Sequence, residues 1–102
     1  ATIIQTKNPA EAVEGVHCVV TETWVSMGEN KTKENQLLLK PYQVDETLMK
    51  GARPDAIFMH CLPAHRGEEV STAILDAPDS IVWEEAENRL HTQKALLEYL
   101  LN

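Results

Sequence analysis

Short apolar runs alternate with helix-like segments along the 102 residues of the chain. The run Ala56-Ile57-Phe58-Met59 is apolar at every position, which is typical of a parallel strand covered on both faces. Together with other runs rich in Ile, Val and Thr, it predicts strands at residues 2–6, 16–23, 56–61 and 80–83. Helices are predicted at residues 9–14, around 36–39, and at 46–50, 68–75 and 87–101.

Capping and turn residues separate these elements. Asn8-Pro9 is a helix start, and Gly15 is placed to end that helix. Asp45 and Gly51 bracket the third helix in the same way. Strands that alternate with helices indicate βαβ units. The pattern therefore predicts an α/β, Rossmann-like fold, with a mostly parallel sheet of about four strands and flanking helices.

Length and charge narrow the class of protein. The chain is long enough for one small domain, and it begins on Ala1-Thr2-Ile3-Ile4 as if already inside a strand, so we expect a partial domain. The net charge of −7 argues against a nucleic-acid partner or an anionic membrane surface. The two cysteines show no disulfide pattern, and no signal peptide or membrane-spanning run is visible, which favours a cytoplasmic location.

Polar side chains follow three of the predicted strands, in the segments 21–28, 60–67 and 83–89. The carboxyl ends of parallel strands share one edge of a sheet, where ligands bind. The edge would carry Glu22, Ser26, His60, Cys61 and Arg89. Each alone is more simply a turn residue, a solvated charge or a surface cation. Together they suit a ligand that carries both charges.

Cys61 needs a base nearby to act as a nucleophile, and otherwise is a small buried apolar residue. His60 is its neighbour, but adjacent residues of a strand point to opposite faces, so we expect His60 not to serve Cys61 directly. The pairs His17-Cys18 and His60-Cys61 split across the sheet for the same reason. Two ligands make a poor zinc site, so no metal is expected.

The backbone at Leu62-Pro63 has two interpretations. A tight corner after a strand tolerates a cis bond, while an ordinary trans proline is commoner. Arg89 is also ambiguous, because it falls in the first turn of the predicted helix 87–101. It could join free backbone N–H groups to bind phosphate, or it could pair with Glu85 on the surface.

Three motifs in order carry a family resemblance. Ser26-Met27-Gly28 follows the Thr21-Glu22-Thr23-Trp24 segment, His60-Cys61-Leu62-Pro63 comes next, and Glu87-Asn88-Arg89 is last. Their order, spacing and places at strand ends resemble the carboxy-terminal part of ornithine carbamoyltransferases. The resemblance covers nearly the whole chain.

The resemblance implies an enzyme that transfers the carbamoyl group of carbamoyl phosphate to the side-chain amine of ornithine, giving citrulline and phosphate. By the same resemblance, the enzyme requires no cofactor and no metal. By resemblance, Ser26 and Met27 contact the amino-acid end of ornithine, and Cys61 is the presumed proton acceptor near the reacting amine. Cys61 and Leu62 line carbamoyl phosphate, and Arg89 binds its charged end.

The family pattern also bears on three further positions. It implies a cis Leu62-Pro63 bond and makes His60 and Pro63 supporting residues. At Glu22, a substrate-binding position, the family usually has aspartate. The longer side chain leaves open another amine, such as putrescine or acetylornithine. A non-catalytic α/β binding or interaction module is the other alternative.

Residues 1–102 would be the carboxy-terminal part of the ornithine-binding domain, without the carbamoyl phosphate domain. We therefore expect this chain alone to be inactive. The family further implies a trimer-based homo-oligomer with sites between subunits.

Overall fold

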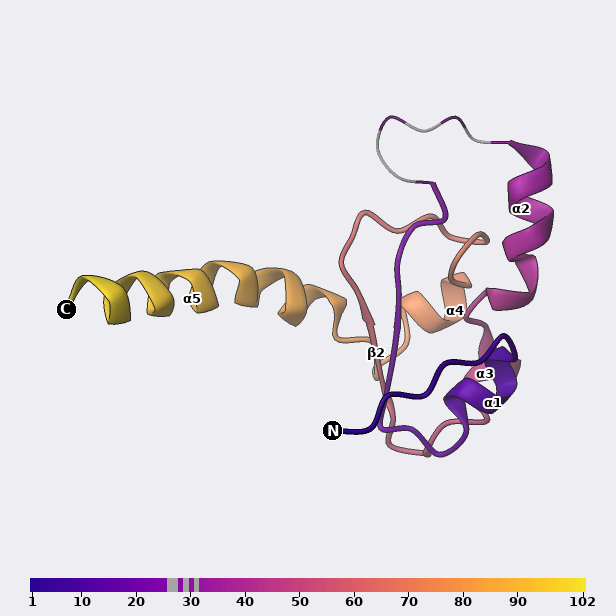
Figure 1. Cartoon of the computed structure of the whole chain (residues 1–102), viewed down its shortest axis with the longest axis horizontal. Helices are drawn as coiled ribbons and strands as arrows, with labels where there is room; N and C mark the ends of the chain where they lie inside the picture. Colours follow the sequence, from indigo (N-terminus) through magenta and orange to yellow (C-terminus); the bar gives the residue numbers. More distant parts are fainter. Residues whose placement is uncertain (26–27, 29, 31) are drawn as a thin grey trace.

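The computed structural model describes residues 1–25, 28, 30 and 32–102 (Figure 1). A parallel sheet with flanking helices confirms the predicted α/β class. The elements in chain order are α1 (Pro9–Val13), β1 (Cys18–Thr21), α2 (Lys33–Leu39), the 3-10 helix η1 (Lys40–Tyr42), α3 (Glu46–Met49), β2 (Ile57–His60), α4 (Thr72–Leu75) and α5 (Val82–Leu101).

The sheet has two strands within the described residues, not the predicted four. β1 and β2 run parallel, in a register that pairs Cys18 with Ile57 and Thr21 with His60. The predicted strand 2–6 is absent because it has no neighbour to pair with there, and its Ile3 and Ile4 are 93% and 81% exposed. The predicted strand 80–83 is reduced to one parallel bridge between Phe58 and Ser80.

Helix α5 explains why that last strand is so short. Phe58 N–H donates to the Asp79 carbonyl, and Ile81 N–H donates to the Phe58 carbonyl. The chain then turns into α5 at Val82, so the helix begins five residues before the predicted 87. Glu84 and Glu85 lie in its first turn, where negative charge is favourable.

The short helices begin where side chains cap them. The Asn8 side chain accepts from the N–H groups of Ala10 and Glu11 at the start of α1. Asp45 accepts from Leu48 N–H at 2.8 Å to begin α3. Ser71 caps α4, which is why that helix is shorter than the predicted 68–75.

One hydrophobic core holds β2 against the short helices. Phe58 of β2 is 1% exposed and packs in a cluster with Ile74 and Leu75 of α4 and with Val82 at the start of α5. The rest of the cluster is Val13, Val19, Val44, Ala52, Ala56 and Val70. Two polar side chains, His60 and Glu69, are wholly buried beside it.

Helix α5 leads away from this core and carries the C-terminus at its far end (Figure 1). Of the described residues in α5, Val82 is the buried one. The leucines of this helix are exposed, with Leu90 at 67% and Leu97 at 59%. No described helix is both long and apolar enough to cross a membrane.

Candidate functional site

The carboxyl ends of β1 and β2 lie side by side because Thr21 pairs with His60. The next residues, Glu22 and Cys61, line one pocket of about 420 Å³ together with Val20, Thr21 and Glu85. Cys61 is exposed and is a free thiol. The structure therefore brings the predicted carboxylate and the predicted thiol to one place.

A second pocket, of about 560 Å³, also has Cys61 in its lining. It is lined by Cys61, Leu62, Pro63, Ala64, Arg66, Leu75, Trp83, Ala86 and Arg89. Cys61 lines both pockets. The predicted residues 61–63 and Arg89 thus line the same pocket, and Arg66 adds a second guanidinium group to it.

The prediction that Arg89 lies in the first turn of a helix is wrong. Because α5 begins at Val82, Arg89 lies about two turns inside it, away from the free N–H groups of the helix start. No ion pair joins Arg89 to Glu85 in the described part of the chain. Glu85 Oε2 instead accepts the backbone N–H of His60 at 3.0 Å.

His60 is buried and has partners on both ring nitrogens. Its Nδ1 accepts the Leu62 N–H at 2.8 Å, and its Nε2 lies 2.9 Å from Glu69 Oε1. A backbone N–H can only donate, so we assign the ring proton to Nε2, which donates to Glu69. The ring accepts from the backbone that carries Leu62, and the supporting role of His60 stays a prediction.

Glu69 is a residue that sequence reasoning missed. Its Oε1 accepts from His60 Nε2 and from the His65 N–H at 2.7 Å, and its side chain is wholly buried. It follows His60 by nine residues in a polar segment that read as the start of a helix. The one available signal was that a buried histidine needs a hydrogen-bond partner, and Glu69 is an acid in the segment that follows His60.

Leu62 occupies a backbone region that non-glycine residues rarely adopt, with φ of 57°. The His60 side chain holds this turn through the Leu62 N–H. The Leu62-Pro63 bond is cis, as the family resemblance implies. The predicted contacts of Ser26 and Met27 lie outside the described residues.

Cys18 differs from Cys61 in its surroundings. Burial raises the pKa of the Cys18 thiol above its ordinary value of 9.0, and the negative charge of Glu85 raises this pKa further. A raised pKa keeps Cys18 in its unreactive thiol form near neutral pH. Cys61 is therefore the thiol to consider for chemistry.

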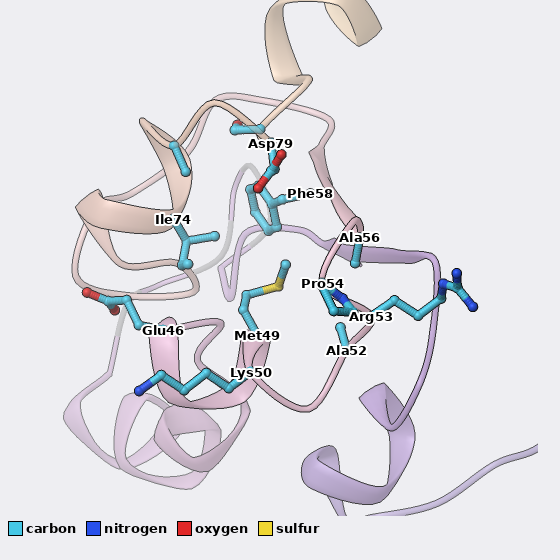
Figure 2. Close-up of a pocket in the computed structure, with 12 residues that line it drawn as sticks. Glu46, Met49, Lys50, Ala52, Arg53, Pro54, Ala56, Phe58, Ile74 and Asp79 are labelled. Atoms are coloured by element: carbon cyan, nitrogen blue, oxygen red, sulfur yellow. The ribbon is translucent and has the colours of Figure 1, made fainter.

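A further pocket, of about 450 Å³, lies between α3, α4 and the beginning of β2 (Figure 2). Met49, Phe58 and Ile74 point toward its interior, while Lys50 and Arg53 extend at its margin (Figure 2). None of the predicted site residues lines it. The candidate site is therefore at the strand ends.

The family model for the Asp/Orn binding domain of aspartate/ornithine carbamoyltransferases matches residues 1–100. The chain belongs to the aspartate/ornithine carbamoyltransferase family. It is 59% identical over 96 residues to an ornithine carbamoyltransferase of Hydrogenovibrio crunogenus, covering 93% of this chain and 32% of that protein. It is 62% identical over 94 residues to that of Nitrosococcus oceani, covering 91% of this chain and 31% of the relative.

Solved carbamoyltransferase structures share the fold. The ornithine carbamoyltransferase of Pyrococcus furiosus superimposes with a TM-score of 0.82 at 50% identity, over 88% of this chain and 29% of that one. The ornithine transcarbamoylase of Giardia lamblia gives a TM-score of 0.83 at 36% identity, over 94% and 30%. The chain thus spans about a third of the length of the carbamoyltransferases that it matches.

Proposed function

We propose that this chain is part of an enzyme that transfers the carbamoyl group of carbamoyl phosphate to the side-chain amine of ornithine. The observation that carries the proposal is the position of Cys61, which lines one pocket with Glu22 and another with Arg89. A cationic amine suits a pocket that contains carboxylates, and phosphate suits a pocket that contains guanidinium groups. An amine in one pocket would then meet a carbamoyl group in the other beside Cys61.

In the proposed reaction the neutral amine nitrogen attacks the carbonyl carbon of carbamoyl phosphate. The bond from that carbon to the phosphate oxygen then breaks, so the products are citrulline and phosphate. The bound ammonium loses one proton to solvent before the attack, and we assign Cys61, as its thiolate, as the acceptor of the second proton, which leaves the nitrogen after the attack. Arg89 is assigned to the charged end of carbamoyl phosphate, where a cation stabilises the departing phosphate.

The remaining assignments follow the family resemblance. Ser26 and Met27 would contact the amino-acid end of ornithine, and Leu62 would line carbamoyl phosphate. The missing two-thirds of the relatives' length would supply a carbamoyl phosphate domain, and the complete protein would be a trimer-based homo-oligomer. We propose a cytoplasmic location, supported by the two free cysteines.

The test is a chimera in which this chain replaces the matching segment of the Hydrogenovibrio crunogenus relative. We expect the chimera to form citrulline from ornithine and carbamoyl phosphate. Cys61→Ser should lower the rate on the order of a hundredfold or more, the range for loss of a proton-transfer group. Arg89→Ala should cost roughly a hundred- to a thousandfold, as for loss of a charge-stabilising donor.

Two other substitutions in the chimera serve as matched controls. Cys18→Ser removes the other thiol, and Arg53→Ala removes an exposed arginine that pairs with Asp55 at 3.1 Å. Both should leave citrulline formation nearly unchanged. A folded chimera without activity, or with full activity in Cys61→Ser and Arg89→Ala, would overturn the proposal. If the chimera turned over putrescine or acetylornithine faster than ornithine, that amine would be the substrate in place of ornithine.

A further inference from the structure

Three side chains with metal-ligating atoms meet in the loop after the candidate site. His65, Glu68 and Glu69 each offer one such atom, and these atoms lie within 4.8 Å of one another. None of the three belongs to the predicted substrate contacts. As possible metal ligands the sequence offers His17-Cys18 and His60-Cys61, and no metal is expected at those residues. A cluster of this kind needs a separate reason to be a site.

Glu69 supplies that reason. Its side chain is wholly buried, and its hydrogen bonds with His60 Nε2 and with the His65 N–H both end on Oε1. Its Oε2 is buried and has no hydrogen-bond partner among the described residues. A buried carboxylate oxygen without a donor is unfavourable, because it has lost its hydration and gained no hydrogen bond in return. This oxygen therefore calls for a positive group beside it.

The neighbouring atom fits a shared cation. His65 Nδ1 lies 3.8 Å from Glu69 Oε2, which is longer than a hydrogen bond. A metal–nitrogen bond of about 2.0–2.1 Å and a metal–oxygen bond of about 2.0–2.2 Å can together span up to about 4.3 Å, so one ion can contact both atoms. The His65 side chain is 50% exposed, which gives an ion access from solvent.

We propose that His65, Glu68 and Glu69 form a binding site for a divalent first-row transition cation. One imidazole and two carboxylates make a nitrogen–oxygen set that suits such ions, and Mn²⁺ in particular favours oxygen ligands. The proposal rests on the geometry of His65 and Glu69, with Glu68 as the third ligand. It does not require Glu68 to lack other contacts. Because Glu69 also holds His60, the ion would lie one carboxylate away from that ring.

The experiment titrates Mn²⁺ into the purified protein and follows the loss of the free-ion signal by electron paramagnetic resonance. The wild-type chain should bind one ion. His65→Ala and Glu68→Gln should each weaken binding roughly tenfold or more, since even the loss of residues behind metal ligands has effects of this size. Circular dichroism confirms that the variants are folded. Glu68→Gln preserves size where His65→Ala leaves a gap.

The chain contains a matched control at the surface. His91 Nε2 lies 3.2 Å from Glu87 Oε1 with the same four-residue spacing, and both side chains are mostly exposed. His91→Ala should leave Mn²⁺ binding unchanged, as should Cys18→Ser with Cys61→Ser. Undetectable binding in the wild-type chain would overturn the site. Equal affinity in His65→Ala and wild type would do so too.

Discussion

His60 Nε2 donates to Glu69 Oε1 at 2.9 Å, and neither side chain is exposed to solvent. The pair joins the end of β2 to the loop nine residues later. The other ring nitrogen of His60 accepts the Leu62 N–H, so the same ring also fixes the turn beside Cys61. The candidate site thus depends on a polar contact inside the core.

Removing the Glu69 carboxylate should destabilise the protein strongly. Glu69→Ala leaves the His60 Nε2–H and the His65 N–H without an acceptor, and each such loss costs about 1–3 kcal/mol. We therefore expect the free energy of unfolding to fall by roughly 2–6 kcal/mol, measured by urea denaturation. Glu87→Ala, at an exposed position, should change it little. Equal effects of the two substitutions would contradict a structural role for Glu69.

His60 can be replaced so that one of its two contacts survives. Asparagine places an acceptor near the Nδ1 position, so His60→Asn should keep the Leu62 contact and lose Glu69. Glutamine reaches the Nε2 position, so His60→Gln should do the reverse. If His60 acts by holding the turn at Leu62, the chimera with His60→Asn should form citrulline faster than the one with His60→Gln. Rates are compared per folded protein, and the opposite order would refute this role.

At position 62 a glycine variant should be more stable than an alanine variant, the reverse of the usual order. At φ of 57° a side chain carries a cost of about 1–2 kcal/mol that glycine lacks. Leu62→Ala and Leu62→Gly both lose the leucine atoms beyond Cβ that pack against the core, and differ only in the Cβ itself. We therefore expect Leu62→Gly to be more stable than Leu62→Ala by about 1 kcal/mol in urea denaturation. Alanine at least as stable as glycine would show that the turn relaxes once leucine is removed.

Glu22 tests how far the carboxylate may lie from the reacting amine. Aspartate at this position withdraws the carboxylate by about 1.5 Å, the length of one C–C bond. In the chimera we expect Glu22→Asp to lower the KM for ornithine, because the family resemblance has aspartate there. Glu14→Asp, at an exposed residue outside the pockets, is the control. An unchanged KM would make the longer side chain harmless.

Cys18 gives the protein a pH dependence at the alkaline end. Its pKa is higher in the folded state than its ordinary 9.0, so the folded state holds this proton more tightly. The resulting stabilisation is complete below pH 9.0 and is lost as the pH rises through the folded-state pKa. Glu85→Gln removes the charge that contributes to the shift. Alkylation of Cys18 should then begin at lower pH than in wild type, and an identical profile would assign the whole shift to burial.

The sequence predicted what local patterns determine. The apolar run 56–59 identified β2, and the run rich in Val and Thr before it identified β1. The rule that parallel strands end at one edge then predicted that Glu22 and Cys61 lie close together, and they line one pocket. The strand at 2–6 was wrong because a strand needs a neighbour, and propensity alone says nothing about one. The start of α5 was missed since residues 80–83 are rich in β-forming side chains, whereas the structure ends their pairing after one bridge.

Glu69 could not be placed from the sequence for a related reason. Its contact with His60 depends on the path of the loop between residues 61 and 68, and that path has no periodicity to read. The cis bond after Leu62 was likewise anticipated from family likeness and not from propensity.

The attachment of α5 at one end has a mechanical consequence. At 1.5 Å per residue its 20 residues reach about 30 Å, so the helix is a lever whose fixed point is Val82. The Glu85 contact with the His60 N–H adds a second fastening one turn along. Displacement of a lever grows with distance from its fixed point. The position of Arg89, two turns along the helix, is therefore set by these two attachments. The leucines beyond Arg89 are positioned only by the surface against which they pack.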